Sequence, residues 1–306
     1  MTTQVMAFGY QENWWPILTS PFMANALAGG TIVALAAGLV GYFVIVRNTA
    51  FAAHALAHIG LPGATGAVLV GVPVAVGLGV FCVGGALVIG VLGKRASDRE
   101  IATGTVLALA TGFGLFFNSL ATKSSSTMTN VLFGNLLAIS RDQLTTFAVL
   151  LVVLAVSIGA VYRPLLFSSV NSQVAEAKSV RVRLLSMIFM VLLALAVTMA
   201  VQAVGTLLLF ALIVTPAATA IMLTPRPLAA MAISTAISIV SVWVGVAISA
   251  MFNLPPSFAI VTIACGVWLA VWIVERQVRP MSTAARRAEP EPVGDHTGIV
   301  GDHSHR

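Results

Sequence analysis

Charged side chains are scarce in this sequence of 306 residues: Asp, Glu, Lys and Arg together make up 8%, whereas hydrophobic residues make up 58%. A soluble globular domain carries about a quarter charged residues, so the composition excludes an ordinary water-soluble domain. The net charge of +6 does not indicate nucleic-acid binding, because no basic face recurs and the positive residues sit between apolar runs. The composition therefore indicates a protein whose solvent is membrane lipid.

Cysteine chemistry and a nucleotide-binding loop are also lacking. The only cysteines, Cys82 and Cys265, both lie inside apolar runs, so neither a disulfide framework nor a cysteine metal site is indicated. The dipeptide Gly93-Lys94 lacks both the upstream glycine and the following Ser or Thr of a phosphate-binding loop. We therefore expect no enzyme activity of the chain itself, and an ATP-driven process would need a separate ATP-hydrolysing subunit.

What the sequence does contain is a series of apolar runs of about 20 residues, each long enough to cross a hydrocarbon core of about 30 Å as a helix. They predict an all-α, polytopic transmembrane helix bundle. Nine spans are expected, at 20–46, 50–72, 73–93, 101–120, 143–162, 184–203, 206–223, 227–250 and 257–275. The apolar segment 130–140 is too short to cross and is expected to be re-entrant or interfacial.

The positive residues predict the orientation of the bundle. With the N-terminus outside, only Lys123 and Arg141 of the 16 Lys and Arg residues fall on the outer side. We therefore expect an extracytoplasmic segment at 1–19, a transmembrane domain at 20–279 and a disordered cytoplasmic tail at 280–306. The expected location is the bacterial cytoplasmic (inner) membrane.

Two histidines are the only ionisable residues expected well inside the spans. His54 and His58 are four residues apart, so on a helix their imidazoles project from one face, one turn apart, and can converge on one metal ion. Counted from Asn48, they lie some 9–15 Å into the membrane, at about 1.5 Å per residue. A transported ion is expected to bind there transiently, with no tightly bound cofactor. The alternative is a pair of histidines hydrogen-bonded within a packed bundle.

Two further segments have features that a transporter could use. Thr215 and Pro216 lie within an expected span, where the proline frees a helical carbonyl near Leu212 and could kink a transport pathway, although packing explains it as well. The longest cytoplasmic connection, 163–183, has a helix-forming centre, for which a short surface helix is expected. Its residues are Gln173, Val174, Ala175, Glu176, Ala177 and Lys178.

Four segments together resemble the permease subunits of zinc and manganese uptake ABC transporters, the ABC-3 family. They are Phe51–Gly63, Val131–Ser140, Gln173–Arg183, and Val204–Leu208 continuing through Pro216–Ala220. In that family, Asp-x-x-x-His commonly stands where this chain has His54 and His58, and both positions are implicated in metal passage. Because imidazole suits zinc better than manganese, the exchange at His54 favours zinc, with manganese next.

The resemblance also implies the partners of the chain. It implies a pore of two permeases, for which we expect a homodimer, a cytoplasmic ATP-binding subunit dimer and an extracytoplasmic metal-binding protein. The loop around Glu176 resembles the coupling helix that docks in the ATPase, with Ser179 replacing the family's usual glycine. The expected function is that of the permease of an ATP-driven importer for a divalent transition metal.

Two other functions are compatible with a membrane bundle. One is an ATP-independent secondary cation carrier or channel with His54 and His58 as a proton relay, which an isolated gene without a neighbouring ATPase gene would favour. The other is a permease for iron chelates or vitamin B12. That function needs a wide polar cavity and gives no reason for a histidine pair inside a span.

Overall fold

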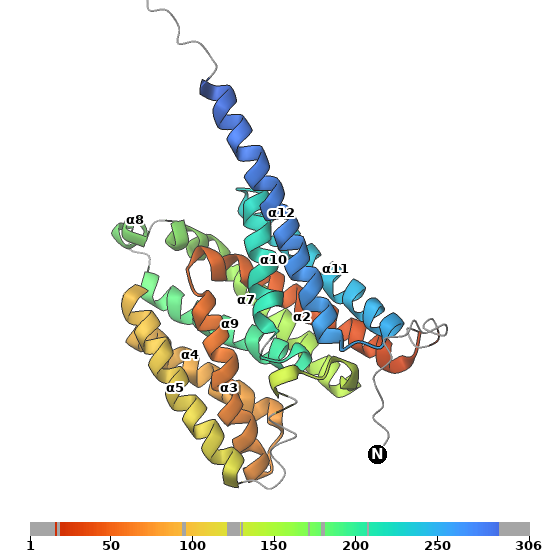
Figure 1. Cartoon of the computed structure of the whole chain (residues 1–306). Coiled ribbons are helices and arrows are strands. Elements are labelled where there is room, and N and C mark those ends of the chain that lie inside the picture. The colour runs from red at the N-terminus through yellow and green to blue at the C-terminus, as the bar shows by residue number, and fades with distance from the viewer. Residues whose placement is uncertain are drawn as a thin grey trace, which may run out of the picture.

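A computed structural model describes residues 16, 19–93, 96–120, 129, 131–170, 172–178, 181–206 and 208–287, with the backbone alone at 96–97, 172–173 and 278–287. The described residues form helices and no strand, which confirms the all-α bundle (Figure 1). The elements are α2 (Pro21–Val46), α3 (Ala50–Val70), α4 (Val74–Leu92), α5 (Ala96–Leu120), η1 (Leu136–Ala138), α7 (Arg141–Val170), α8 (Ser172–Ala177), α9 (Val182–Val204), α10 (Leu209–Leu223), α11 (Pro227–Phe252) and α12 (Pro256–Arg287).

Eight helices in the described part of the chain are long and apolar enough to cross a membrane. The seventh expected span, 206–223, differs, because α10 begins only at Leu209 and has 15 residues. At about 1.5 Å per residue it is some 22 Å long, shorter than a hydrocarbon core. The helix starts late because Gly205 has a φ of 84° and the Thr206 amide donates to the Val131 carbonyl at 3.0 Å, which holds this stretch out of helical geometry.

Hydrogen bonds between helix ends agree with alternate crossings. At one end of the bundle, Arg47 is hydrogen-bonded to Ser168 and Ser186. At the other end, three hydrogen-bonded pairs join distant segments: Thr206 with Val131, Gln143 with Gln202, and Ser257 with Phe133. For the pairs that lie within the part of the chain from α3 to α9, an even number of expected spans lies between the two bonded residues. The two residues of each pair are therefore on the same side of the membrane. The contacts of Thr206 and Ser257 with one segment further require α10 and α11 to cross as a pair, although α10 is short.

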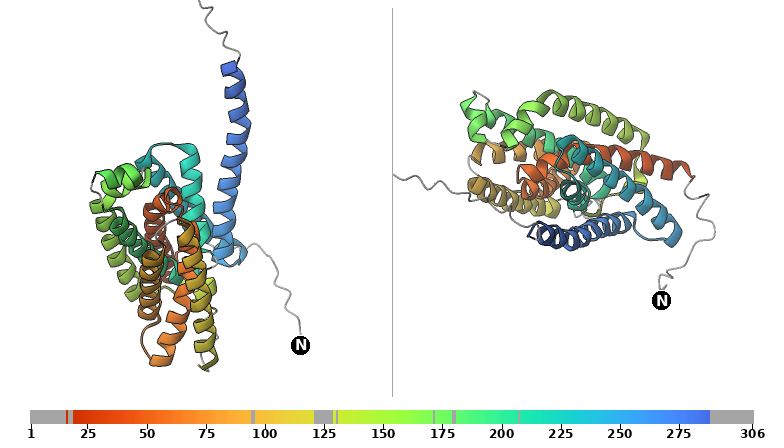
Figure 2. Two further views of the ribbon diagram at one scale, coloured as in Figure 1. Left: turned by 90° about the vertical axis from the view of Figure 1, so that its left-hand side faces the viewer. Right: turned by 90° about the horizontal axis from the view of Figure 1, so that it is seen from above.

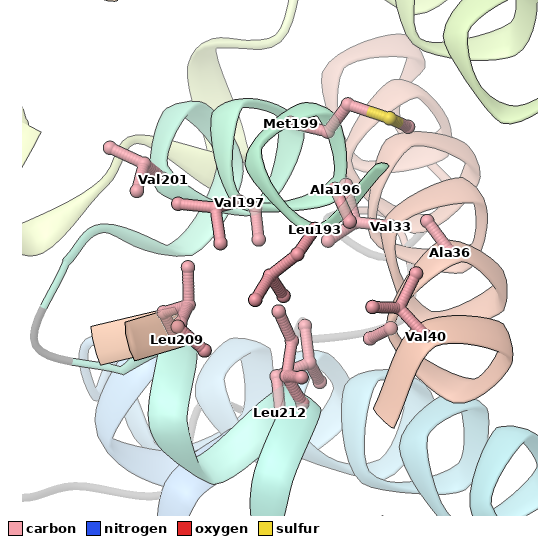
Figure 3. Close-up of a cluster of buried hydrophobic side chains, with 14 of the residues drawn as sticks. Val33, Ala36, Val40, Leu193, Ala196, Val197, Met199, Val201, Leu209 and Leu212 are labelled. Carbon is pink, nitrogen blue, oxygen red and sulfur yellow. The ribbon is translucent and has the colours of Figure 1, made fainter. Parts of the chain in front are cut away.

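Helices α2, α3 and α9 form the centre of the bundle. In each of them 67% of the apolar span is buried, compared with 22% in α5 and 17% in α7 and α12. Figure 3 shows the interior packing, where Val33 and Val40 of α2 meet Leu193 of α9 and Leu212 of α10. The outer helices present large apolar side chains outward, which is the arrangement expected of a bundle surrounded by lipid.

Small residues permit the closest helix contacts. A Cβ built on Gly63 of α3 would lie 2.2 Å from the carbonyl oxygen of Gly77 in α4, and one on Gly77 would lie 2.2 Å from that of Gly63. Only glycine fits at both positions, so the two backbones touch. The glycines at 63 and 77 therefore fix how closely α3 packs on α4.

Two expected segments take on definite structure. Segment 131–139 packs its Val131, Leu136 and Ile139 side chains inward and contacts α2 and α9 through η1.

Helix α12 continues as far as Arg287, past residue 280 where the tail was expected to begin, and projects beyond the other helices (Figure 2). Residues 288–306 lie outside the described residues, as do 1–15 of the expected outer segment.

Candidate functional site

Helix α3 begins directly after a tight corner that its sequence builds. Asn48 has a φ of 52°, in the left-handed region that Asn tolerates, and the Thr49 amide donates to the Val44 carbonyl at 2.9 Å. The chain thus leaves α2 and enters α3 with almost no loop. This corner fixes the register of α3 and, with it, the positions of His54 and His58.

The structure brings the two predicted histidines together. Their ring centroids lie 4.8 Å apart, with the ring planes at 73°. The Nδ1 atom of His54 is buried and has no hydrogen-bond partner among the described residues. A buried imidazole nitrogen without a protein partner is unusual in a packed bundle, and it is free to bind a ligand.

The histidine face of α3 points away from the tightly packed α3–α4 contact. At about 100° per residue, His54 and His58 project roughly 120–180° away from Gly60 and Gly63, which touch α4. On the histidine side, the ring of Phe210 at the start of α10 has its centroid 6.3 Å from that of His54. Both histidines are half-buried, and Phe210 is 42% exposed. The pair therefore lies on a face that its own chain covers only in part.

The spacing of the rings suits two ligands of one ion. A zinc ion lies about 2.0–2.1 Å from an imidazole nitrogen and hence about 3.2 Å from the ring centre, so two rings at a tetrahedral angle have centres roughly 5 Å apart. The observed 4.8 Å matches this value. Within the described residues no group of three or more His, Cys, Asp or Glu side chains gathers, so one chain offers two nitrogens and leaves the other coordination positions open.

The segment expected to meet an ATPase does form a short helix, α8. Ala175 is fully buried, while Glu176, Ala177 and Lys178 are exposed, and the Lys178 ammonium lies 5.9 Å from the Phe167 ring centroid in α7. The helix is thus pinned by one small side chain and presents charged groups outward. The backbone of Gln173 is helical, and Ser179 lies outside the described residues.

Pro216 is buried within α10, and the helix continues through it. The carbonyl of Leu212, which the proline deprives of its helical donor, accepts a hydrogen bond from the Ser238 hydroxyl of α11 at 3.3 Å. The Thr215 carbonyl accepts from the Thr219 hydroxyl at 2.8 Å. The neighbouring helix α11 therefore satisfies the carbonyl that the proline leaves free.

A cavity with a partly polar lining, at the opposite end of the bundle from α8, was not foreseen from the sequence. It has a volume of about 510 Å³ between α4, α7, α9 and segment 131–140. Its polar lining includes Asn135, Asp142 and the hydrogen-bonded pair Gln143 and Gln202, whose side chains lie 3.2 Å apart. No spacing in the sequence predicts this cavity, because its lining residues come from segments that are distant along the chain.

Comparison with known proteins finds matches over most of the chain. The ABC 3 transport family matches residues 19–275. The manganese transport system membrane protein MntC of Listeria innocua is 31% identical over 255 residues, covering 82% of this chain and 90% of that protein. The manganese import system permease protein ScaB of Streptococcus parasanguinis is 34% identical over 201 residues, covering 65% of this chain and 71% of ScaB.

A solved structure shares the fold. The structure of PsaBC from Streptococcus pneumoniae in complex with Fab contains a chain that superimposes with a TM-score of 0.75 at 27% identity, covering 84% of this chain and 93% of the other. The resemblance that the four sequence segments indicated is thus confirmed over nearly the whole helical region.

Proposed function

The chain belongs to the ABC 3 transport family, and from this premise we propose that it is the permease subunit of an ATP-driven importer for a divalent transition metal. It is a multi-pass protein of the bacterial inner membrane. The observation that supports a metal as cargo is the histidine pair on α3, with ring centres 4.8 Å apart and a buried, unpartnered Nδ1 on His54. His54 and His58 bind the ion in passing and release it.

Two observations bear on which metal is carried. The names of MntC and ScaB describe manganese transport, which favours manganese. The donor atoms favour zinc, because two imidazoles are softer ligands than the oxygen donors that manganese prefers. Zinc and manganese are therefore the two cargoes to be compared directly.

A second copy of the chain completes the site in our proposal. Two imidazoles leave a four-coordinate ion with two open positions, and the histidine face is only half covered by its own chain. A two-fold axis beside this face would bring two copies of His54 and His58 together and supply up to four nitrogens. An importer must also release its cargo, so we expect this sphere to be incomplete in at least one state of the cycle.

ATP hydrolysis is assigned to a separate cytoplasmic subunit that docks on α8. The outward-facing Glu176, Ala177 and Lys178, held on a helix pinned by the buried Ala175, suit a rigid docking element. At the other end of the bundle, an extracytoplasmic metal-binding protein would deliver the ion. The rival function, a secondary carrier with a histidine proton relay, is less well supported, since the family is one of ABC transporters.

Metal accumulation in cells depleted of this protein tests the proposal, with zinc, manganese and iron measured together. We expect a selective fall in zinc or manganese that returns when the intact chain is restored. Equal contents of all three metals with and without the protein would contradict it. Uptake that persists without ATP but stops when the proton gradient is collapsed would instead favour the secondary carrier.

A further inference from the structure

Arg47 joins three helices at the end of the bundle that carries α8. It follows the last residue of α2, and its guanidinium donates to the hydroxyls of Ser168 at 3.1 Å, Ser169 at 3.0 Å and Ser186 at 2.6 Å. The same guanidinium lies 5.5 Å from the ring centroid of Phe189 in α9. A single side chain therefore binds partners 121 to 139 residues away along the chain.

These serines flank the proposed coupling helix on both sides. Ser168 and Ser169 lie in the last turn of α7, directly before α8, whereas Ser186 lies in the first turns of α9, directly after it. Helix α8 contacts both α7 and α9, so a displacement of α8 by a docked ATPase would act on these two helix ends. Arg47 is the residue that contacts both.

On its other side, Arg47 is connected to the histidine pair. It is followed by Asn48 and Thr49, the tight corner that starts α3, and His54 comes seven residues after it. Only about 6 Å of rigid helix separates Ala50 from His54, at about 1.5 Å per residue. A shift of Arg47 is therefore transmitted to the histidines with little chain in between to absorb it.

The partners of Arg47 are neutral, which suits a contact that breaks and re-forms. Among the described residues no carboxylate lies within ion-pair distance of Arg47. Burial, with a smaller contribution from the nearby Arg99, lowers the pKa of Arg47 to about 10, so it stays charged at neutral pH. Breaking a buried ion pair would leave a second bare charge, whereas hydroxyl groups can exchange their partner for water.

We propose that Arg47 is a positioning residue that couples movement of α8, through the ends of α7 and α9, to the α2–α3 corner that orients His54 and His58. This inference rests on the proposed function, in which α8 meets the ATPase and the histidines bind the metal. Arg47 itself touches neither ATP nor the transported ion. Its loss should uncouple hydrolysis from transport rather than abolish either binding step.

The test is the number of metal ions transported per ATP hydrolysed, in proteoliposomes that contain the complete transporter. For Arg47→Met we expect this ratio to fall at least fivefold, while ATP hydrolysis stays within twofold of the unmodified transporter. The matched control is Arg226→Met, which removes an exposed arginine on the same side of the membrane and should leave the ratio unchanged. If Arg47→Met does not fold, the milder double variant Ser169→Ala, Ser186→Ala replaces it in the test. It keeps the arginine and should also lower the ratio.

An unchanged ratio in both Arg47→Met and the double serine variant would overturn the inference. A proportional fall of hydrolysis and transport would also overturn it, because a purely structural clasp predicts less active protein with normal coupling. Failure of the proposed function gives a different result, since the unmodified transporter would then carry no metal at all.

Discussion

Gly63 lies on the face of α3 opposite to the histidine pair, and the substitution Gly63→Ala should shift the whole helix and the histidines with it. The added Cβ would lie 2.2 Å from the Gly77 carbonyl oxygen and 2.8 Å from the Phe81 Cβ. Since non-bonded atoms settle near 3.5 Å, α3 must move away from α4 by about 1 Å. The movement is directed towards the face that carries His54 and His58. Overpacking of this kind typically costs about 1–3 kcal/mol.

The assay combines thermal unfolding of the purified protein with metal uptake. We expect Gly63→Ala to unfold at a lower temperature and to transport metal at least tenfold more slowly, because misplacement by about 1 Å can cost as much as 100-fold at a site that depends on geometry. The control is Gly84→Ala in α4, where a Cβ would meet nothing within 4 Å and should change neither quantity. Wild-type uptake and stability in Gly63→Ala, or an equal loss in Gly84→Ala, would refute the reasoning.

Three other predictions concern orientation, coupling and the tail. Labels near Lys123 should react from outside intact cells and labels near Lys94 or Glu176 should not; reaction of Glu176 from outside would reverse the orientation. Ala175→Pro should break α8 and reduce transport while the bundle still inserts, because proline removes a helical hydrogen bond, and unchanged uptake and ATPase association would remove α8 from the mechanism. Deletion of 284–306 should leave most uptake intact, and complete loss of transport would show that the tail is essential.

The helices were predictable because lipid imposes a simple rule on each of them. A spanning helix must satisfy its own backbone, so long apolar runs identify it without any tertiary information. The prediction was least accurate where tertiary contacts decide. The expected span begins at residue 206, but the close approach of Gly205 to Gly134, where a Cβ added to Gly205 would lie 2.5 Å from the Gly134 nitrogen, keeps Thr206 out of a helix, and α10 begins at Leu209.

Helix α12 is longer than the apolar span that it contains. Its apolar run ends near Gln277, and the sequence beyond it is polar, so a span ending at 275 was expected. The helix nevertheless continues to Arg287. Hydropathy marks where a helix leaves the lipid, whereas the end of the helix itself depends on where its backbone hydrogen bonding stops.

The histidine pair was predictable because four-residue spacing is a local property of a helix. Its surroundings were not, since Phe210 lies on a helix far along the chain and reaches His54 only after folding. The same holds for Arg47, whose serine partners are 121 to 139 residues away. Local spacing identifies candidate ligands, whereas the contacts that couple them to the rest of the molecule require the folded structure.

Uptake of radioactive zinc and manganese by proteoliposomes that contain the complete transporter tests the central claim most directly. The double variant His54→Ala, His58→Ala should lose uptake of both metals while it still inserts and binds its ATPase. His54→Asp should keep some transport and shift it towards manganese, because a carboxylate is the harder ligand. Wild-type uptake of zinc and manganese in the double variant would contradict the account and make the histidine pair a packing feature of α3.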